Sequence, residues 1–462
     1  FFILLLLAAF NNAIAQTTPV FGRADTAAIQ MKECSFDRDA PAMHLINTEQ
    51  IEFSFGYYRG YEVITQKWVR TKIFNQKGYD YASIIIPYFS NKRSAKITNL
   101  DAYVYTPNED GTISIHGLDK NEIFKEKPKR SSGKNSMRFT FPNLKPGSVI
   151  EYRYTLTEKN NLHIHPWFFQ DEIPVQVSSY SLTLPSDVKI YSHTIATLPV
   201  EADSVLNKKT DDLKRTYTMR NVPAFKMEPM MTSISDNLQR IEFALVPKMT
   251  MLGFTVTING DDRWSMYNSL LLSASFFGEQ IKKEIPGIEQ AIDSIKKITD
   301  PNEKIKAVYQ LVQQNIKWDD EQTFYADDVD ECWKNKEGNS ASINLAMINL
   351  LRKVGIENTF PILVSTRENG RTDMTFPSLS QFNGVDVLVY DSSYVYVLDG
   401  TQKYLPFGAK PVNILNRNAF LIDRYNSQWV TITESAPLMN SAVIVNAALD
   451  SSGIIHGDAE LI

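Results

Sequence analysis

Apolar and polar residues alternate in short segments over the first half of the chain. The clearest such segments are residues 83–88, 148–157 and 176–184. Within the second of these, Glu151 and Arg153 fall on one face and the neighbouring Ile and Tyr residues on the other, as in an antiparallel strand with one buried face. The dipeptide Asp110-Gly111 is typical of a hairpin turn. We therefore expect an all-β sandwich over residues 25–247.

A helical period replaces this alternation further along the chain. Asp300 and Pro301, with an acidic residue three positions after Asp300, form the start signal of a helix. The next apolar residues recur at helical spacing, at Ile305, Val308, Tyr309, Val312 and Ile316. A second helix is predicted from about Ser340 to a stop at Gly355. Strands are then expected at residues 360–364, 384–390 and 394–398. This order predicts an α+β unit over residues 251–430.

Alternation returns in the last part of the chain, from residue 431 onwards. Two alternating runs, residues 441–449 and 454–462, flank a Ser-Ser-Gly turn. We expect residues 431–462 to be the beginning of a truncated C-terminal β domain. At roughly 100 to 200 residues per domain, 462 residues also suggest about three domains.

The first residues are almost entirely apolar. Residues 1–10 form a Leu-rich run and are followed by Ala13-Ile14-Ala15, which resembles a signal-peptidase site. Residues 1–15 are therefore predicted to be a partial signal peptide. No Cys follows the predicted cleavage site, and no later apolar run reaches the roughly 18 residues of a membrane span. We expect an exported protein, periplasmic or extracellular, that is not lipid-anchored.

Composition excludes some partners and cofactors. With 48 Lys and Arg against 53 Asp and Glu, the net charge is −5, so a strongly basic nucleic-acid binder is excluded. The hydrophobic fraction of 43% is that of a globular protein. Cys34 and Cys332 lie far apart and form neither a metal-ligand pattern nor a disulfide framework, so independent thiols are expected. No metal or other cofactor is expected.

Several segments of the predicted α+β unit carry a family pattern. One family helix begins with Gly-Asp-Cys and ends with Leu-Leu-Arg-x-x-Gly-Ile-Glu, and it is similar to Gly338–Leu345 together with Leu350–Glu357. The helix that precedes it in the family is similar to Glu303–Trp318. Phe382–Val385 and Leu398–Thr401 correspond to strands that read Phe-Asn-His-Val and Leu-Asp-x-Thr. In this order and spacing, the segments resemble the core of the transglutaminase-like superfamily. The resemblance implies a papain-like fold.

The first half of the chain also resembles a known domain. The segments Asp37–Ala42, Lys72–Asn75 and Pro146–Tyr152 are similar to a β domain of unknown function. Bacterial exported proteins fuse that domain ahead of a transglutaminase-like core. Together, the matches cover most of the chain.

The resemblance implies a catalytic triad, which this sequence does not preserve. In the family, a Cys at the start of the helix is activated by a His, which an Asp orients. The corresponding positions here hold Ser340, Gly384 and Asp399. A serine gains less than a cysteine from the helix dipole and depends on a base, and glycine has no side chain to act as one. The triad is therefore degenerate, and the sequence predicts no confident catalytic residue.

The positions of the histidines support the same interpretation without any family. The six histidines are His44, His116, His163, His165, His193 and His456. None lies between Thr194 and Ile455, so the α+β unit lacks the usual general base near neutral pH. A replacement base would have to be a histidine from the β domain, or Lys334 or Lys336 with a lowered pKa.

Cys332 is a further candidate nucleophile outside the triad positions. It precedes Ser340 closely and would lie near the site if a loop carried it there. Its neighbours, however, include Asp327, Asp328 and Asp330, whose charges would raise the pKa of the thiol. An isolated, unreactive side chain is therefore favoured.

Three functional hypotheses remain open. The first is an exported transglutaminase-like protein without catalytic activity, which binds a protein, peptide or glycan or has a structural role in the cell envelope. The alternative is an amide hydrolase or acyl transferase of the cysteine or serine type, which would use Ser340 or Cys332 with a non-histidine base. In the third, the two β regions bind a partner or glycan, and residues 251–430 only separate them.

Overall fold

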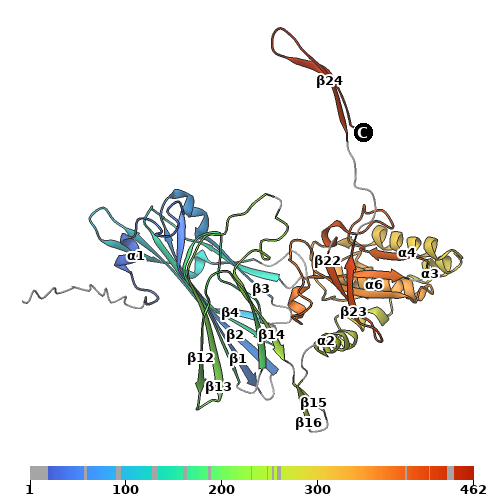
Figure 1. Cartoon of the computed structure of the whole chain (residues 1–462), viewed down its shortest axis with the longest axis horizontal. Coiled ribbons are helices and arrows are strands. Elements are labelled where there is room, and N and C mark those ends of the chain that lie inside the picture. Colours follow the sequence, from blue (N-terminus) through green and yellow to red (C-terminus); the bar gives the residue numbers. More distant parts are fainter. Residues whose placement is uncertain are drawn as a thin grey trace, which may run out of the picture. The chain divides into compact units, whose positions relative to one another are not determined.

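The computed structural model in Figure 1 contains two compact units. The structure describes residues 19–56, 60–89, 95–126, 134–159, 164–185, 189–229, 231–246, 248–251, 254–257, 262–390, 393–415, 417–433 and 442–461. Unit 1 consists of Phe1–Leu270 with Arg367–Gln381, and unit 2 consists of Leu271–Thr366 with Phe382–Ile462. The expected signal peptide lies outside the described residues. The expected domain boundaries remain predictions.

A large, mostly antiparallel sheet forms the main layer of unit 1 (Figure 1). Its strand order is β12-β13-β10-β1-β2-β8-β4-β5, in which β1 and β10 run parallel. The strands are β1 (Ala42–Gly56), β2 (Gly60–Ile73), β4 (Ala95–Pro107), β5 (Ile113–Gly117), β8 (Val149–Lys159), β10 (Val175–Pro185), β12 (Glu201–Asn207) and β13 (Asp212–Val222). The turn predicted at Asp110-Gly111 joins β4 to β5, where Gly111 has the positive φ that such a turn requires.

Two smaller sheets cover one face of the large sheet. They are β3 (Ser83–Phe89), β7 (Lys134–Thr140) and β6 (Phe124–Glu126), and β11 (Lys189–Ile195), β14 (Arg240–Val246) and β9 (Trp167–Phe168). Each smaller sheet shares a hydrophobic cluster with the large one, centred on Phe139 and Ile150 in one case and on Tyr180 and Phe243 in the other. The expected all-β sandwich is therefore confirmed. Unit 1 also contains the pair β15 (Lys248–Met251) and β16 (Phe254–Thr257) and the 3-10 helices η1 (Gln76–Ala82) and η3 (Lys120–Glu122).

The opposite face of the large sheet is covered by residues 19–40, which we call the N-terminal strap. The strap contains α1 (Thr26–Gln30), whose N-cap Asp25 accepts hydrogen bonds from two backbone N–H groups. Glu151, which strand alternation places on a polar face, is fully buried there beside Arg70. The expectation that this face of β8 is solvent-exposed was therefore wrong at Glu151, because the strap and Arg70 cover the carboxylate.

Helices packed on a second sheet form unit 2. The sheet order is β21-β20-β19-β22-β23. Its strands are β19 (Thr359–Val364), β20 (Gly384–Tyr390), β21 (Val395–Leu398), β22 (Arg417–Leu421) and β23 (Gln428–Ile432). The helices are α3 (Glu289–Lys296), α4 (Pro301–Asn315), α5 (Val329–Asn335) and α6 (Ser340–Lys353), preceded by α2 (Asp262–Ser273), which begins in unit 1. Unit 2 also contains four short elements, β17 (Lys317–Trp318), β18 (Glu337–Gly338), η4 (Gln280–Lys282) and η6 (Val412–Ile414).

The two helices predicted in this region are confirmed, and so is the α+β class. Asp300 caps α4 by accepting the N–H groups of Asn302 and Glu303, as the capping-box pattern predicts. Helix α6 is buried from Ser340 to Leu351, and Gly355 just beyond its end has a positive φ. Burial of every turn of α6 places the residues at its start inside the unit.

The connection from β19 to β20 passes through residues 367–381, which belong to unit 1 and contain η5 (Leu379–Gln381). The backbone N–H of Arg371 donates to Asp236 Oδ1 at 2.7 Å, and Trp264 Nε1 donates to the Met374 carbonyl at 2.9 Å. His193 Nδ1 lies 3.4 Å from Asp373 Oδ2. These contacts fix the inserted segment on unit 1.

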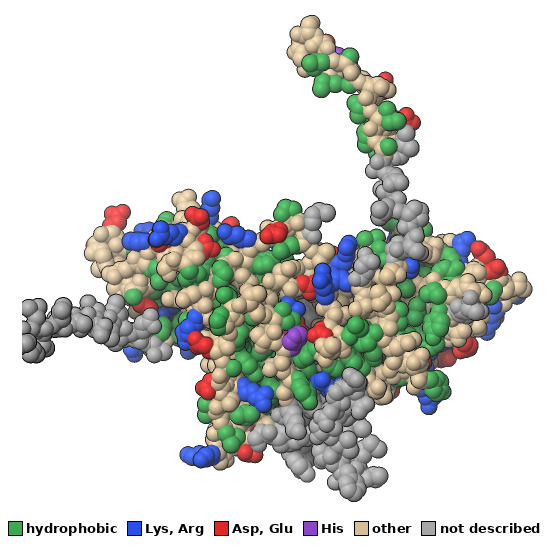
Figure 2. Space-filling view, viewed as in Figure 1, with side chains coloured by type: hydrophobic (Ala, Val, Ile, Leu, Met, Phe, Trp, Pro, Cys, Tyr) green, Lys and Arg blue, Asp and Glu red, His purple; other side chains and the backbone are tan. Residues whose placement is uncertain are grey.

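The alternation predicted at the end of the chain forms a hairpin of β24 (Val443–Leu449) and β25 (Ile455–Leu461). One face carries the apolar pairs Val443 with Leu461 and Leu449 with Ile455. These side chains are exposed, and hydrophobic groups are visible along the hairpin in Figure 2. More β structure thus follows the core. Across the described ranges, the helices are too short or too polar to cross a membrane.

Candidate functional site

Ser340, at the position implied for the nucleophile, is the first residue of α6. The N-cap Asn339 accepts the N–H of Ser342 at 2.8 Å, so the chain enters the helix in a fixed geometry. Ser340 is 1% exposed. Its Oγ donates to the Thr323 carbonyl at 2.8 Å and accepts the Thr323 N–H at 2.9 Å. The hydroxyl is therefore engaged on both sides by the backbone of one residue.

Thr323 belongs to a loop, residues 319–328, that lies against the start of α6. Ser342 Oγ accepts the N–H of Asp327 at 3.1 Å, and Asn339 Nδ2 donates to the Tyr325 carbonyl at 3.0 Å. Polar side chains of the first turn of α6 thus bind the backbone of this 319–328 loop at three places. The serine position consequently has a structural role in this fold.

Gly384, at the position implied for the base, is the first residue of β20. A Cβ atom built on this glycine would collide with Nε2 of Gln322 and would lie 3.0 Å from Val364 Cγ2. Gln322 is part of the 319–328 loop. The side-chain amide of Gln322 therefore occupies the space in which a larger residue at position 384 would begin.

This geometry predicts that Gly384→Ala destabilises unit 2 by about 1–2 kcal/mol, because a methyl group must displace a packed side chain. In a Gln322→Ala background, the same substitution should cost clearly less, since only the contact with Val364 remains. Urea unfolding of the single and double variants measures this coupling. Equal costs in the two backgrounds would show that Gln322 does not fill the space beside Gly384.

Asp399, at the orienting position, follows the last residue of β21 and is 5% exposed. Its Oδ1 accepts from Thr401 N–H at 3.0 Å and from Asn344 Nδ2 at 3.1 Å. Its Oδ2 accepts from Thr401 Oγ1 at 2.8 Å and from Gln402 Nε2 at 3.3 Å. The carboxylate therefore holds the turn after β21 and the middle of α6.

Sequence reasoning missed a second carboxyl group beside Asp399. Asp386, on β20, is 3% exposed, and its Oδ1 lies 3.5 Å from Nδ2 of Asn344. Burial, and then the charge of Asp399, raise the pKa of Asp386 well above its ordinary value. The signal in the sequence was a lone acidic residue among valines in the run from Val385 to Val389. The two carboxyl groups are bridged by the amide of Asn344.

Cys332 lies on α5 and not on a loop, although the fold does bring it close to the start of α6. Its Sγ packs against Gly338, where a Cβ atom would collide with it. Cys332 is 4% exposed. Burial raises the pKa of its thiol to about 12, with smaller contributions from Asp319, Asp327 and Asp328. The thiol is therefore protonated at neutral pH.

The other candidate groups do not assemble into a catalytic arrangement. Lys334 and Lys336, considered as replacement bases, are exposed, and Lys336 Nζ lies over the ring of Trp333 at 4.5 Å. Cys34 and Cys332 are both free and buried. Within the described ranges, no group of three His, Cys, Asp or Glu side chains is arranged to hold a metal ion.

Comparisons with known proteins agree with both halves of the fold. The family described as a domain of unknown function, DUF3857, matches residues 63–226, and the transglutaminase-like superfamily matches residues 289–364. No curated protein matches the chain.

One solved structure shares the fold over most of this chain. A candidate protease from Parabacteroides distasonis aligns with a TM-score of 0.63 at 14% identity, over 89% of this chain and 78% of that one. An M1 zinc metallopeptidase from Deinococcus radiodurans aligns with a TM-score of 0.24 at 9% identity, over 48% of this chain and 47% of that one. The chain therefore carries a DUF3857 domain in its N-terminal part, followed by a transglutaminase-like core.

Proposed function

We propose that this chain is an exported protein whose transglutaminase-like core does not catalyse acyl transfer or hydrolysis, and which instead binds a protein, peptide or glycan or has a structural role in the cell envelope. The 319–328 loop carries the argument. Its Thr323 backbone engages the Ser340 hydroxyl, and its Gln322 side chain occupies the space beside Gly384. The loop thus fills the place where the papain-like chemistry of the family would occur.

Acyl transfer needs a nucleophile that the substrate can reach and a base within hydrogen-bond reach of that nucleophile. Ser340 Oγ is buried and donates its proton to a carbonyl oxygen, which cannot accept it as a base would. The chain has no histidine between Thr194 and Ile455. Both requirements are therefore unmet at this end of α6.

The alternative, hydrolysis or acyl transfer through Ser340 or Cys332, gains no support from the geometry. A thiol with a pKa of about 12 is almost entirely protonated at neutral pH, and the thiolate is the reactive form. Export is supported by the apolar run and the Ala-x-Ala site in residues 1–15. A binding role is compatible with a core in which the 319–328 loop lies where the catalytic residues of the family would meet.

The test is an activity assay on the purified full-length chain with amide substrates and with acyl acceptors. We expect no turnover above the background rate, and no difference between the parent chain and Ser340→Ala. Turnover that disappears in Ser340→Ala would overturn the proposal, provided that the thermal midpoints of the two proteins agree.

A thiol-reactive electrophile tests Cys332 in the same preparation. The buried Cys34 serves as an internal reference, because both thiols should stay unlabelled in the folded chain and react after denaturation. Rapid labelling of Cys332 alone in the folded chain would favour the cysteine-type enzyme.

A further inference from the structure

The turn from Val20 to Arg23, in the N-terminal strap, is held on the large sheet through its backbone. The N–H of Arg23 donates to the Val20 carbonyl at 3.3 Å, and Gly22 at the third position has a φ of +79°, which glycine adopts without strain. Glu151 Oε1 accepts the Gly22 N–H at 2.7 Å. Arg70 Nη2 donates to the carbonyls of Val20 at 3.0 Å and Arg23 at 3.1 Å. The sheet therefore recognises the shape and the backbone of this turn.

Only one side chain of the turn, that of Phe21, is held by specific ring contacts. Its ring stands edge-on to the rings of Trp68 and Tyr103, with centroids 6.3 and 5.6 Å apart. The guanidinium of Arg153 lies over the same ring, 4.2 Å from its centroid. Trp68, Arg153 and Tyr103 lie on the neighbouring strands β2, β8 and β4, and we call them the aromatic box. Such contacts favour an aromatic ring over an aliphatic side chain.

The groups that bind the turn are held in place without it. Glu151 and Arg70 form an ion pair, and the hydroxyl of Tyr105 donates to Glu151 at 3.0 Å. These bonds join residues of β2, β4 and β8 and would remain if the turn left the sheet. The turn itself buries little apolar surface, because the side chains of Val20 and Arg23 are exposed. Segments of this kind open locally at a low cost in free energy.

The turn also leaves one donor of the site without an acceptor. Arg70 is 1% exposed, and its Nη1 has no hydrogen-bond partner in the described part of the chain. A buried N–H group without an acceptor is destabilising. A ligand that brings one more carbonyl or carboxylate oxygen to Arg70 would therefore bind better than the turn of the strap does.

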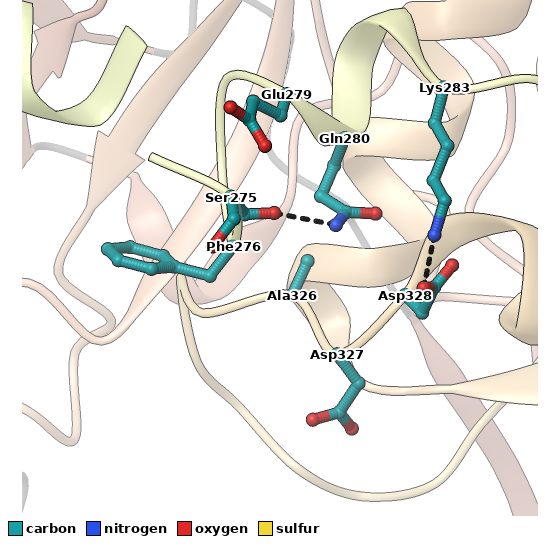
Figure 3. Close-up of a pocket in the computed structure, with 8 residues that line it drawn as sticks. All are labelled: Ser275, Phe276, Glu279, Gln280, Lys283, Ala326, Asp327 and Asp328. Atoms are coloured by element: carbon teal, nitrogen blue, oxygen red, sulfur yellow. Dashed lines mark hydrogen bonds and ion pairs between the residues drawn. The ribbon is translucent and has the colours of Figure 1, made fainter. Parts of the chain in front are cut away.

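The pocket of about 450 Å³ in unit 2 has no comparable arrangement (Figure 3). Lys283 in its lining is already paired with Asp328. The carboxylates of Glu279 and Asp327 lie on opposite sides of the lining in Figure 3. These charges do not converge on one point, whereas the groups around the turn of the strap do.

We propose that the aromatic box and the pair of Arg70 and Glu151 form a binding site for a β-turn of a partner protein, in which an aromatic residue is followed by a glycine. The strap occupies this site until the turn of the partner replaces residues 20–23. The bound turn of the strap shows the chemistry that the site accepts. The inference rests on the binding role proposed above. Turnover in the activity assay would overturn that role and leave peptide binding unaffected, whereas a failure of peptide binding would overturn only this inference.

The test is isothermal titration of the full-length Phe21→Ala chain, in which the aromatic box loses its ring and the backbone partners remain. The ligand is acetyl-Pro-Val-Phe-Gly-Arg-Ala-amide, the sequence of residues 19–24. A control peptide with alanine in place of phenylalanine should bind at least about tenfold more weakly. The parent chain should also bind the phenylalanine peptide at least about tenfold more weakly, because its own Phe21 competes within the same molecule.

Three outcomes would overturn the proposal: no binding of the phenylalanine peptide to Phe21→Ala, equal binding of the two peptides, or equal binding to the parent chain and Phe21→Ala. Phe21→Leu, which also lacks an aromatic ring, takes the place of Phe21→Ala if that variant does not fold.

A third peptide tests the turn itself. Alanine in place of the glycine should weaken binding to Phe21→Ala by at least about fivefold, because an alanine is strained at the φ of +79° that Gly22 adopts. Equal binding of the glycine and alanine peptides would refute binding as the turn that the strap forms.

A second substitution in the Phe21→Ala chain locates the site. Arg153→Gln should weaken binding of the phenylalanine peptide by about fivefold, because the cation over the ring is lost. Arg138→Gln is the matched control, since Arg138 is also half exposed and paired with a carboxylate, that of Glu126, but lies on a smaller sheet. The peptide is positively charged, so general electrostatics would strengthen binding in both variants. Equal effects of the two substitutions would refute the location in the aromatic box.

Discussion

Replacing Glu151 by alanine should destabilise unit 1 by about 3–5 kcal/mol, because it leaves the guanidinium of Arg70 buried without its counter-charge. Arg70 is 1% exposed and Glu151 is fully buried, so water cannot replace the lost partner. We expect this substitution to have one of the two largest effects on the stability of the chain.

The carboxylate of Glu151 has other hydrogen-bond partners besides Arg70. Its Oε1 accepts the N–H of Gly22 at 2.7 Å and the hydroxyl of Tyr105 at 3.0 Å. Arg70 Nη2 in turn donates to the carbonyls of Val20 at 3.0 Å and Arg23 at 3.1 Å. The ion pair therefore ties the N-terminal strap to β2 and β8, and its loss should release the strap as well as lower the free energy of unfolding.

Urea unfolding measures the loss of stability, and hydrogen exchange of residues 19–40 measures the release of the strap. Asp101→Ala is the matched control. Asp101 pairs with Arg153, two positions along β8 from Glu151, at 2.8 Å, but both side chains are about half exposed. A surface pair of this kind is worth about 0–1 kcal/mol. Similar losses in Glu151→Ala and Asp101→Ala would contradict our account of the buried pair.

A double variant separates the charge from the packing. Arg70→Met combined with Glu151→Leu removes both charges and keeps most of the volume. It should be more stable than Glu151→Ala alone, because no unpaired buried charge remains. Faster hydrogen exchange of residues 20–23 is still expected in the double variant, since the backbone groups of Val20, Gly22 and Arg23 lose their partners.

Glu151 also shows where strand alternation stops being informative. The alternation in β8 correctly predicted the strand and the face that Glu151 shares with Arg153. It could not predict that residues 19–40 would cover this face, because the strap has little periodic structure of its own and is held by side chains distant in sequence. A period of two identifies the faces of a strand, but only the complete fold shows what covers them.

The candidate site was predictable to a similar extent. Local signals predicted α6 and its start at Ser340, the strand β20 beginning at Gly384, and the strand that precedes Asp399. They did not predict that Gln322 fills the space beside Gly384. A loop without periodicity, which includes a left-handed residue at Asp320, supplies that contact. Resemblance to a family directed attention to Ser340, Gly384 and Asp399, and the structure shows that Gln322 lies beside Gly384.

Asp386 should make the stability of unit 2 depend on pH, and Asp386→Asn should remove this dependence. The folded carboxyl has a pKa well above the ordinary value of 3.8, because it is buried beside Asp399. Below pH 3.8 both the folded and the unfolded chain bind the proton. Above it the unfolded chain releases the proton and the folded chain keeps it, so the free energy of unfolding falls by about 1.4 kcal/mol for each pH unit. This loss continues until the pH reaches the folded pKa.

An asparagine at position 386 cannot ionise, and its side-chain oxygen can still accept from Asn344 Nδ2. Asp386→Asn should therefore match the parent chain near pH 4 and become more stable than the parent as the pH rises, gaining about 1.4 kcal/mol per unit. Urea unfolding between pH 4 and 8, with hydrogen exchange of β20 as a local readout, measures the difference. Asp293→Asn, at an exposed position on α3, is the control and should show no such slope. If the stability difference between Asp386→Asn and the parent chain did not change with pH, Asp386 would be ionised in the folded chain. The amide of Asn344 would then stabilise two buried carboxylates, where we expect one carboxylate and one neutral carboxylic acid.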